Sequence, residues 1–92
     1  MKNIMQEKKE CYVTHRTDNL HLHHIYFGAG NRKLSDKLGC VVWLSPEYHN
    51  MSNKGVHFNR EFDLELKREC QKRFEEVYPN LNFREIFGRN YL

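Results

Sequence analysis

Residues 19–25 of this 92-residue chain read Asn19-Leu20-His21-Leu22-His23-His24-Ile25, and the other expected elements are placed relative to this run. Leucine and histidine alternate from residue 20 to residue 23, which is the period-two pattern of a half-buried β-strand. Residues 28–31 (Gly-Ala-Gly-Asn) then interrupt the pattern with turn-forming residues. The tandem imidazoles of His23 and His24 are therefore expected where a strand enters a loop.

The overall composition is typical of one small globular domain. Apolar residues make up 39% of the chain and charged residues 29%, which separates it from disordered sequences. A chain of this length has one small core, so a metal, a partner or a second copy could supply part of the stability. No apolar run approaches the roughly 18 residues that cross a bilayer, and residues 1–7 lack the apolar stretch of a signal peptide. The sequence therefore predicts a cytoplasmic protein with no membrane partner.

Charge and cysteine content give two further indications. The net charge is +3, and all six histidines lie between residues 15 and 57, within a stretch where basic residues outnumber acidic ones. This part is expected to carry the chemistry and the attraction for anions, with the last third as scaffold. The cysteines (Cys11, Cys40 and Cys70) are odd in number and widely spaced, which favours reduced thiols over a disulfide framework.

The expected elements before residue 45 are short. Residues 1–8 are polar and are expected to be disordered, and residues 10–14 could start a strand. The connection over residues 28–39 contains three basic residues and at most one helical turn, at residues 34–38. Residues 40–44 (Cys-Val-Val-Trp-Leu) are a continuous β-branched and aromatic run, which predicts a second strand.

Three helices are expected after this strand. Ser45 and Pro46 are a good N-cap and first helical residue for a short helix that carries His49 and ends near residues 53–55. Asn59 can cap the longest helix, which Pro79 ends and whose apolar positions recur at helical spacing (Phe62, Leu66, Cys70, Phe74 and Val77). A last short helix is expected over residues 82–87. Together these elements predict a single α+β domain over residues 1–92.

The order of these motifs resembles the HNH endonucleases, the ββα-metal or His-Me finger superfamily. The resemblance rests on His23-His24, on the strand and capped helix that lead to His49-Asn50, and on His57. It covers roughly residues 11–60 and is closest to short stand-alone members of bacteriophages and prophages. It implies a ββα-metal core with a short β-hairpin and a short metal-bearing helix. The helical part over residues 60–92, with its longer helix, lies beyond the resemblance and is expected to pack behind this core. A bacterial or phage-infected cell is the implied setting.

The resemblance also implies residue roles. His24 would be the general base that deprotonates a water, and His23 and His49 would be metal ligands. The third ligand would be His57, with Asn53 as the substitute, and the ion would be divalent (Mg²⁺, Mn²⁺, Ni²⁺ or Zn²⁺). Neutral imidazole, with a pKa near about 6.5, can accept a proton at neutral pH. Arg32, Lys33 and Lys37 lie between the two strands, where they could bind neighbouring phosphates.

The chain departs from the family pattern in two places. Many members hold a structural zinc with two Cys-x-x-Cys knuckles, which here read Cys11-Tyr12-Val13-Thr14 and Ser45-Pro46-Glu47-Tyr48. With three of the four thiolates missing, no tetrahedral cysteine zinc site is expected. Many members also have, just before the second strand, an Asn that orients the base, and Cys40 takes that place here.

The expected function is a metal-dependent endonuclease that cleaves or nicks DNA, with RNA as the other candidate substrate. Two alternatives stay open. The first is a protein of the same fold without hydrolysis, used to bind nucleic acid or as a phage accessory or inhibitor protein. The second is a structural zinc domain built on Cys11, His15 and two other histidines. The oligomeric state is also left open, a homodimer included.

Overall fold

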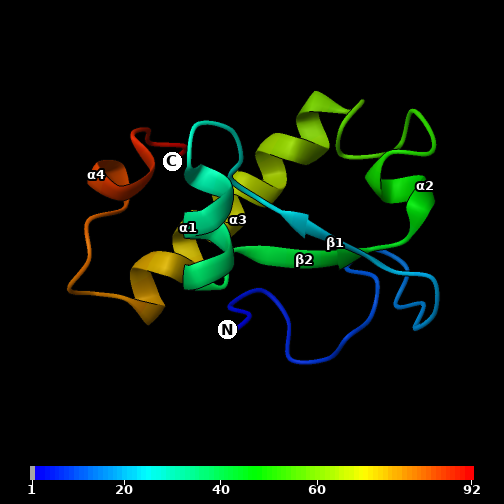
Figure 1. Ribbon diagram of the computed structural model, residues 1–92, viewed down its shortest axis with the longest axis horizontal. Coiled ribbons are helices and arrows are strands. Elements are labelled where there is room, and N and C mark those ends of the chain that lie inside the picture. Colours follow the sequence, from blue (N-terminus) through cyan, green and yellow to red (C-terminus); the bar gives the residue numbers. More distant parts are fainter. Residues whose placement is uncertain (1) are drawn as a thin grey trace.

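A two-stranded antiparallel sheet lies at the centre of the computed structural model, which describes residues 2–92 (Figure 1). The α+β class expected from the sequence is confirmed. The elements in chain order are β1 (His21–His24), α1 (Asn31–Leu38), β2 (Val41–Leu44), α2 (Pro46–His49), α3 (Arg60–Val77) and α4 (Phe83–Phe87). Among residues 2–92, no helix combines the length and the apolar character that a membrane crossing requires.

The two expected strands are present and pair with each other. His21 lies opposite Leu44, and His23 lies opposite Val42. Val41, Val42 and Leu44 are fully buried, which explains why the second strand reads as a continuous apolar run. The strand β1 keeps the alternation of the sequence, so His21 and His23 project from the same face.

The N-terminal segment is ordered, so the expected disorder is wrong for residues 2–8, while Met1 lies outside the described residues. Ile4 and Met5 are buried in the core, and the Ile4 amide donates to the Gly39 carbonyl at 3.0 Å. The Trp43 amide donates to the Gln6 side-chain oxygen at 2.8 Å. Figure 1 shows this segment running beside β2, so it covers the edge of β2 that β1 leaves open.

Residues 10–14 form a turn rather than the expected strand. The Cys11 amide donates to the Arg16 carbonyl at 2.8 Å, which closes the turn on itself. The Tyr12 amide donates to the Trp43 carbonyl at 2.9 Å, so the turn is fastened to the outer edge of β2.

The connection between the strands contains a two-turn helix, α1, longer than the single turn expected. Gly30 and Gly39 bound it, both with the positive φ that favours glycine. The buried Ser35 hydroxyl donates to the Tyr26 carbonyl at 2.6 Å and accepts from the Tyr26 amide at 3.1 Å. These two bonds fasten α1 to the segment that follows β1.

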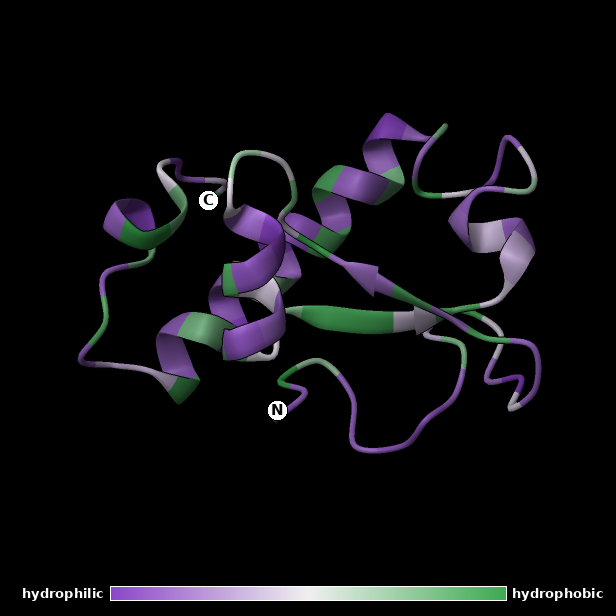
Figure 2. Cartoon of the chain, in the orientation of Figure 1, coloured by the Kyte–Doolittle hydropathy of each residue, from purple (hydrophilic) through white to green (hydrophobic). Residues whose placement is uncertain are grey.

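The long helix α3 supplies most of the scaffold. The Asn59 side chain accepts a hydrogen bond from the Phe62 amide, as expected of the N-cap. Leu66, Cys70 and Phe74 are buried against the sheet and against α4, whose Phe83 and Phe87 complete the core. Figure 2 shows the apolar colour concentrated on β2 and on one side of α3, with the other side of α3 hydrophilic.

Candidate metal centre

His23 is the most deeply placed histidine of the chain. Its residue surface is only 3% exposed, because it projects from β1 toward α2 and the loop that follows. Its Nε2 atom is buried and has no hydrogen-bond partner among residues 2–92. Buried polar atoms in native proteins nearly always have a partner, so an unpaired one needs an explanation.

His49 lies beside His23 and comes from the helix that follows the second strand. The chain leaves β2 at Leu44, turns at Ser45-Pro46 and forms the single turn of α2, of which His49 is the last residue. The helix is shorter than expected, and Asn53 falls in an exposed turn beyond it. Asn53, the substitute for the third ligand, therefore does not lie on the same helix as His49.

His57 is brought to His49 by the backbone. The Val56 amide donates to the Tyr48 carbonyl at 2.8 Å, and the His57 amide donates to the His49 carbonyl at 3.2 Å. Gly55 makes this return possible, since a Cβ atom there would lie 2.7 Å from the His49 carbonyl oxygen. A residue without a side chain is required for so close an approach of two backbone segments.

The three side chains form a group that could hold a metal ion. One ligand nitrogen from each of His23, His49 and His57 can be chosen so that all lie within 4.8 Å of one another. The Nε2 atoms of His49 and His57 are 3.1 Å apart. Nitrogens bound at 2.0–2.1 Å around a tetrahedral ion lie roughly 3.3 Å from each other. The residues therefore fit a metal, and a metal would also give the unpaired His23 Nε2 a partner.

The environment keeps two of these imidazoles neutral at physiological pH. Burial, with smaller contributions from His49 and His57, lowers the pKa of His23 to about 3. Burial and the neighbouring His57 and His21 lower the pKa of His49 to about 4. Because only a ring nitrogen without a hydrogen has a lone pair to donate, His23 and His49 can bind a cation without first losing a proton.

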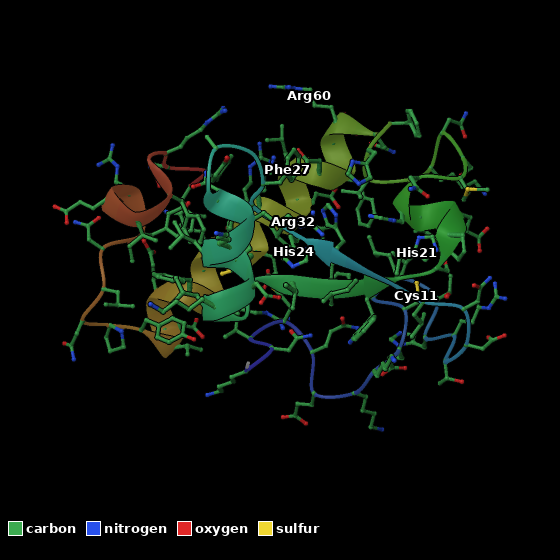
Figure 3. All side chains as sticks on the ribbon, in the orientation of Figure 1. Cys11, His21, His24, Phe27, Arg32 and Arg60 are labelled. Carbon is green, nitrogen blue, oxygen red and sulfur yellow. The ribbon has the colours of Figure 1, made fainter. Side chains whose placement is uncertain are left out.

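His24 lines the same cavity from a different direction. Its Nε2 lies 3.2 Å from an Oδ1 atom of Asp36, a residue of α1, and its side chain is 14% exposed. The cavity has a volume of about 300 Å³ and is lined by Leu22, His23, His24, Phe27, Arg32, His49 and His57. Figure 3 shows His24 and Arg32 near α1, with His21 farther along β1 beside α2.

The three basic residues expected to bind phosphates divide into two groups. Arg32 lines the cavity and is exposed, so its guanidinium can reach a ligand there. Lys33 and Lys37 are exposed on α1 but do not line the cavity. Asp36 follows Arg32 by four residues, the spacing that places two side chains on one helix face.

Two residues near the site were not singled out from the sequence. The first is His21, whose Nδ1 atom lies 2.9 Å from the Nδ1 of His49. The alternation of β1 already placed it on the face of His23, and that signal could have identified it. Asp36 had no such signal beyond its spacing from Arg32, because its partner lies 12 residues away along the chain.

Residues 11–14 and 45–48, the two segments compared above with cysteine knuckles, are joined by hydrogen bonds. The Cys11 sulfur accepts from the amides of Ser45 and Thr14, at 3.3 and 3.5 Å. Burial alone would raise the pKa of Cys11, but its hydrogen bonds with Thr14 and Ser45 outweigh it and lower the pKa to about 7. The His15 side chain pairs with Glu10, with its Nδ1 atom 3.2 Å from the Glu10 Oε2 atom. Within residues 2–92, Cys11 and His15 belong to no candidate metal group, so the zinc site of the second alternative is not formed.

No family model, curated protein or solved structure matches this chain. What can be inferred about function therefore rests on the residues around the cavity.

Proposed function

We propose that this protein is a metal-dependent endonuclease of the HNH type that hydrolyses phosphodiester bonds in DNA. The observation that carries the proposal is the convergence of His23, His49 and His57, with the buried Nε2 of His23 unpaired, in a cavity that a fourth imidazole also lines. A structural metal site would need no such fourth imidazole and no opening to solvent.

The ligand set favours particular metals. His23, His49 and His57 offer three imidazole nitrogens and no carboxylate, which suits Zn²⁺ or Ni²⁺ better than Mg²⁺ or Mn²⁺. When bound, the ion supplies a Lewis acid that polarises a phosphoryl oxygen and offsets the charge that develops during hydrolysis. With three protein ligands, coordination positions stay open for the substrate.

The other residues of the cavity have complementary roles in this proposal. His24 would accept a proton from the attacking water as the water oxygen bonds to phosphorus. The bond from phosphorus to the leaving oxygen breaks, and that oxygen keeps the electron pair and takes a proton from solvent. Arg32 donates hydrogen bonds to the phosphate, because its planar guanidinium matches two phosphate oxygens at once. Lys33 and Lys37 attract neighbouring phosphates through their charge, which makes binding dependent on salt.

The first test is cleavage of supercoiled plasmid by metal-stripped protein supplied with Zn²⁺, Ni²⁺, Mn²⁺ or Mg²⁺. We expect nicking with Zn²⁺ or Ni²⁺, and a loss of roughly 10²–10⁴-fold in His24→Ala, the usual contribution of a general base. His15→Ala is the matched control, because His15 is an exposed histidine paired with Glu10 outside the cavity.

Three results would argue against the proposal. Cleavage by His24→Ala at the wild-type rate would show that His24 is not the general base. DNA binding without nicking under any metal would favour the alternative of a binding protein that has lost hydrolysis. Zinc that can be removed only by unfolding the wild type, together with no cleavage, would indicate a structural site.

A further inference from the structure

We infer that Asp36 is a positioning residue for His24, and that its carboxylate fixes which nitrogen of the imidazole accepts the proton. The inference rests on the proposed nuclease function. It concerns a residue outside the metal ligands and outside the basic side chains, on a helix that joins the two strands.

The geometry is a contact between two separately anchored elements. His24 is the last residue of β1, where its backbone is paired with Val41 of β2. Asp36 follows Ser35, whose hydroxyl makes two hydrogen bonds to the Tyr26 backbone. At its C-terminal end α1 is fastened to the scaffold, since the Tyr78 hydroxyl donates to the Leu38 carbonyl at 2.9 Å. Both backbones are thus fixed, which keeps the Asp36 carboxylate within hydrogen-bond reach of the His24 ring.

The contact also selects a tautomer. Asp36 Oδ1 lies 3.2 Å from Nε2 of His24, and a carboxylate can only accept, so Nε2 must carry the hydrogen. Nδ1 is then the nitrogen with a lone pair that can take a proton from water. The same contact limits rotation of the ring, so Nδ1 is held on the side of the imidazole away from Asp36.

This contact explains how His24 can be oriented although Cys40 replaces the Asn expected before the second strand. Cys40 is fully buried, in the core cluster with Cys70, whose hydrogen bond to it raises the pKa of its thiol. The orienting group comes instead from α1, which also carries Arg32 one turn earlier. One helix thus supplies both the residue that would bind the phosphate and the residue that would position the base.

A merely structural role for the pair would be small. The Asp36 side chain is 59% exposed, and exposed ion pairs contribute little to stability. Asp36→Ala is therefore expected to fold normally, and an effect of this substitution on cleavage can be read separately from an effect on folding.

The test compares Asp36→Ala and Asp36→Asn with the wild type at saturating metal. We expect Asp36→Ala to lower kcat by roughly 10–100-fold with KM changed less than about twofold, because the lost orientation acts on the chemical step. Asp36→Asn should be intermediate, since its amide oxygen still accepts from Nε2–H but forms a weaker hydrogen bond than a carboxylate. Asp18→Ala is the matched control: Asp18 is also an exposed aspartate in an ion pair, with Arg16 at 2.8 Å.

A second measurement does not depend on cleavage. Long-range ¹H–¹⁵N NMR spectra of the metal-free protein should show His24 in the Nε2–H tautomer, and Asp36→Ala should give a mixture. Mixed tautomers in the wild type, or a kcat of Asp36→Ala equal to that of Asp18→Ala, would overturn the inference. A wild type that cleaves nothing would overturn the proposed function, and with it the role of Asp36 in catalysis.

Discussion

At the scale of single residues, His23 is the most constrained side chain of the site. A buried polar atom without a partner costs about 1–3 kcal/mol, and His23 Nε2 is such an atom among residues 2–92. A cation bound by this nitrogen would remove that cost and would stabilise only the folded state. The proposed role as a metal ligand would thus account for a feature that a place in the core leaves unexplained.

His21 is expected to strengthen the metal site without touching the ion. When His49 donates Nε2 to a metal, its Nδ1–H needs an acceptor, and the Nδ1 of His21 lies 2.9 Å away. Removal of such a partner typically weakens metal affinity by roughly 10–100-fold. We expect this loss in His21→Ala, measured for Zn²⁺ by competition with a chromophoric chelator.

His21→Asn and His15→Ala are the comparison variants for this prediction. Asn at residue 21 keeps a side-chain oxygen that can accept from His49, so part of the affinity should return. His15 is exposed and pairs with Glu10, so its replacement should leave the affinity unchanged. Equal affinities of the wild type and His21→Ala would show that His49 is oriented by α2 alone.

At the scale of elements, the junction between α1 and β2 holds the N-terminal segment in place. Gly39 has a φ of 77°, and a Cβ atom on it would collide with the Lys2 carbonyl. Gly39→Ala must therefore strain its backbone and displace the segment that buries Ile4 and Met5. We expect the free energy of unfolding to fall by about 3 kcal/mol, measured by urea denaturation.

Gly30→Ala separates the two causes of this loss. Gly30 also has a positive φ, 90°, but a Cβ atom there would meet nothing within 4 Å. The strain alone should cost about 1–2 kcal/mol. Similar losses in the two variants would mean that contact between the N-terminal segment and α1 contributes little to stability.

Elements with strong local signals could be predicted from the sequence. Asn59 caps α3 as expected, and α4 lies within the expected residues 82–87, with Asn82 as its N-cap. The buried strand β2 was equally clear. The length of α1 could not be predicted because its sequence is dominated by polar residues. The order of the N-terminal segment was missed because Ile4 and Met5 are two isolated apolar residues among polar ones.

The site was partly predictable for a related reason. His23, His24, His49 and His57 stand out by residue type and spacing, and the structure places all four around one cavity. Contacts between residues far apart in the chain leave no such local signal. His21 meets His49 across 28 residues, and Asp36 meets His24 across 12, so both contacts depend on how the elements pack.

At the scale of the whole molecule, the candidate ligands connect segments that are distant in sequence. His23 lies in β1, His49 at the end of α2, and His57 in the loop before α3. An ion bound by all three would close a long loop between His23 and His49 and a short one between His49 and His57. The folded chain has already closed both loops, so the ion binds it in preference to the unfolded chain and stabilises it. Protonation of the same side chains should have the opposite effect on the metal-free protein.

The metal-free protein is therefore expected to lose stability as the pH falls from about 6.5 toward 3. The pKa of His23 is about 3 in the folded state against an ordinary value of 6.5, so the unfolded state binds more protons across this interval. The titration of His23 leaves the free energy of unfolding almost unchanged above pH 6.5 and lowers it progressively below, by about 2 kcal/mol at pH 5. His49, whose pKa is also lowered, changes stability in the same direction.

Urea unfolding in the presence of a chelator, at pH 7 and pH 5, measures this pH-dependent difference in the free energy of unfolding. His23→Leu cannot titrate at this position and should show a correspondingly smaller decrease; an equal decrease in both proteins would mean that His23 is readily protonated in the folded state.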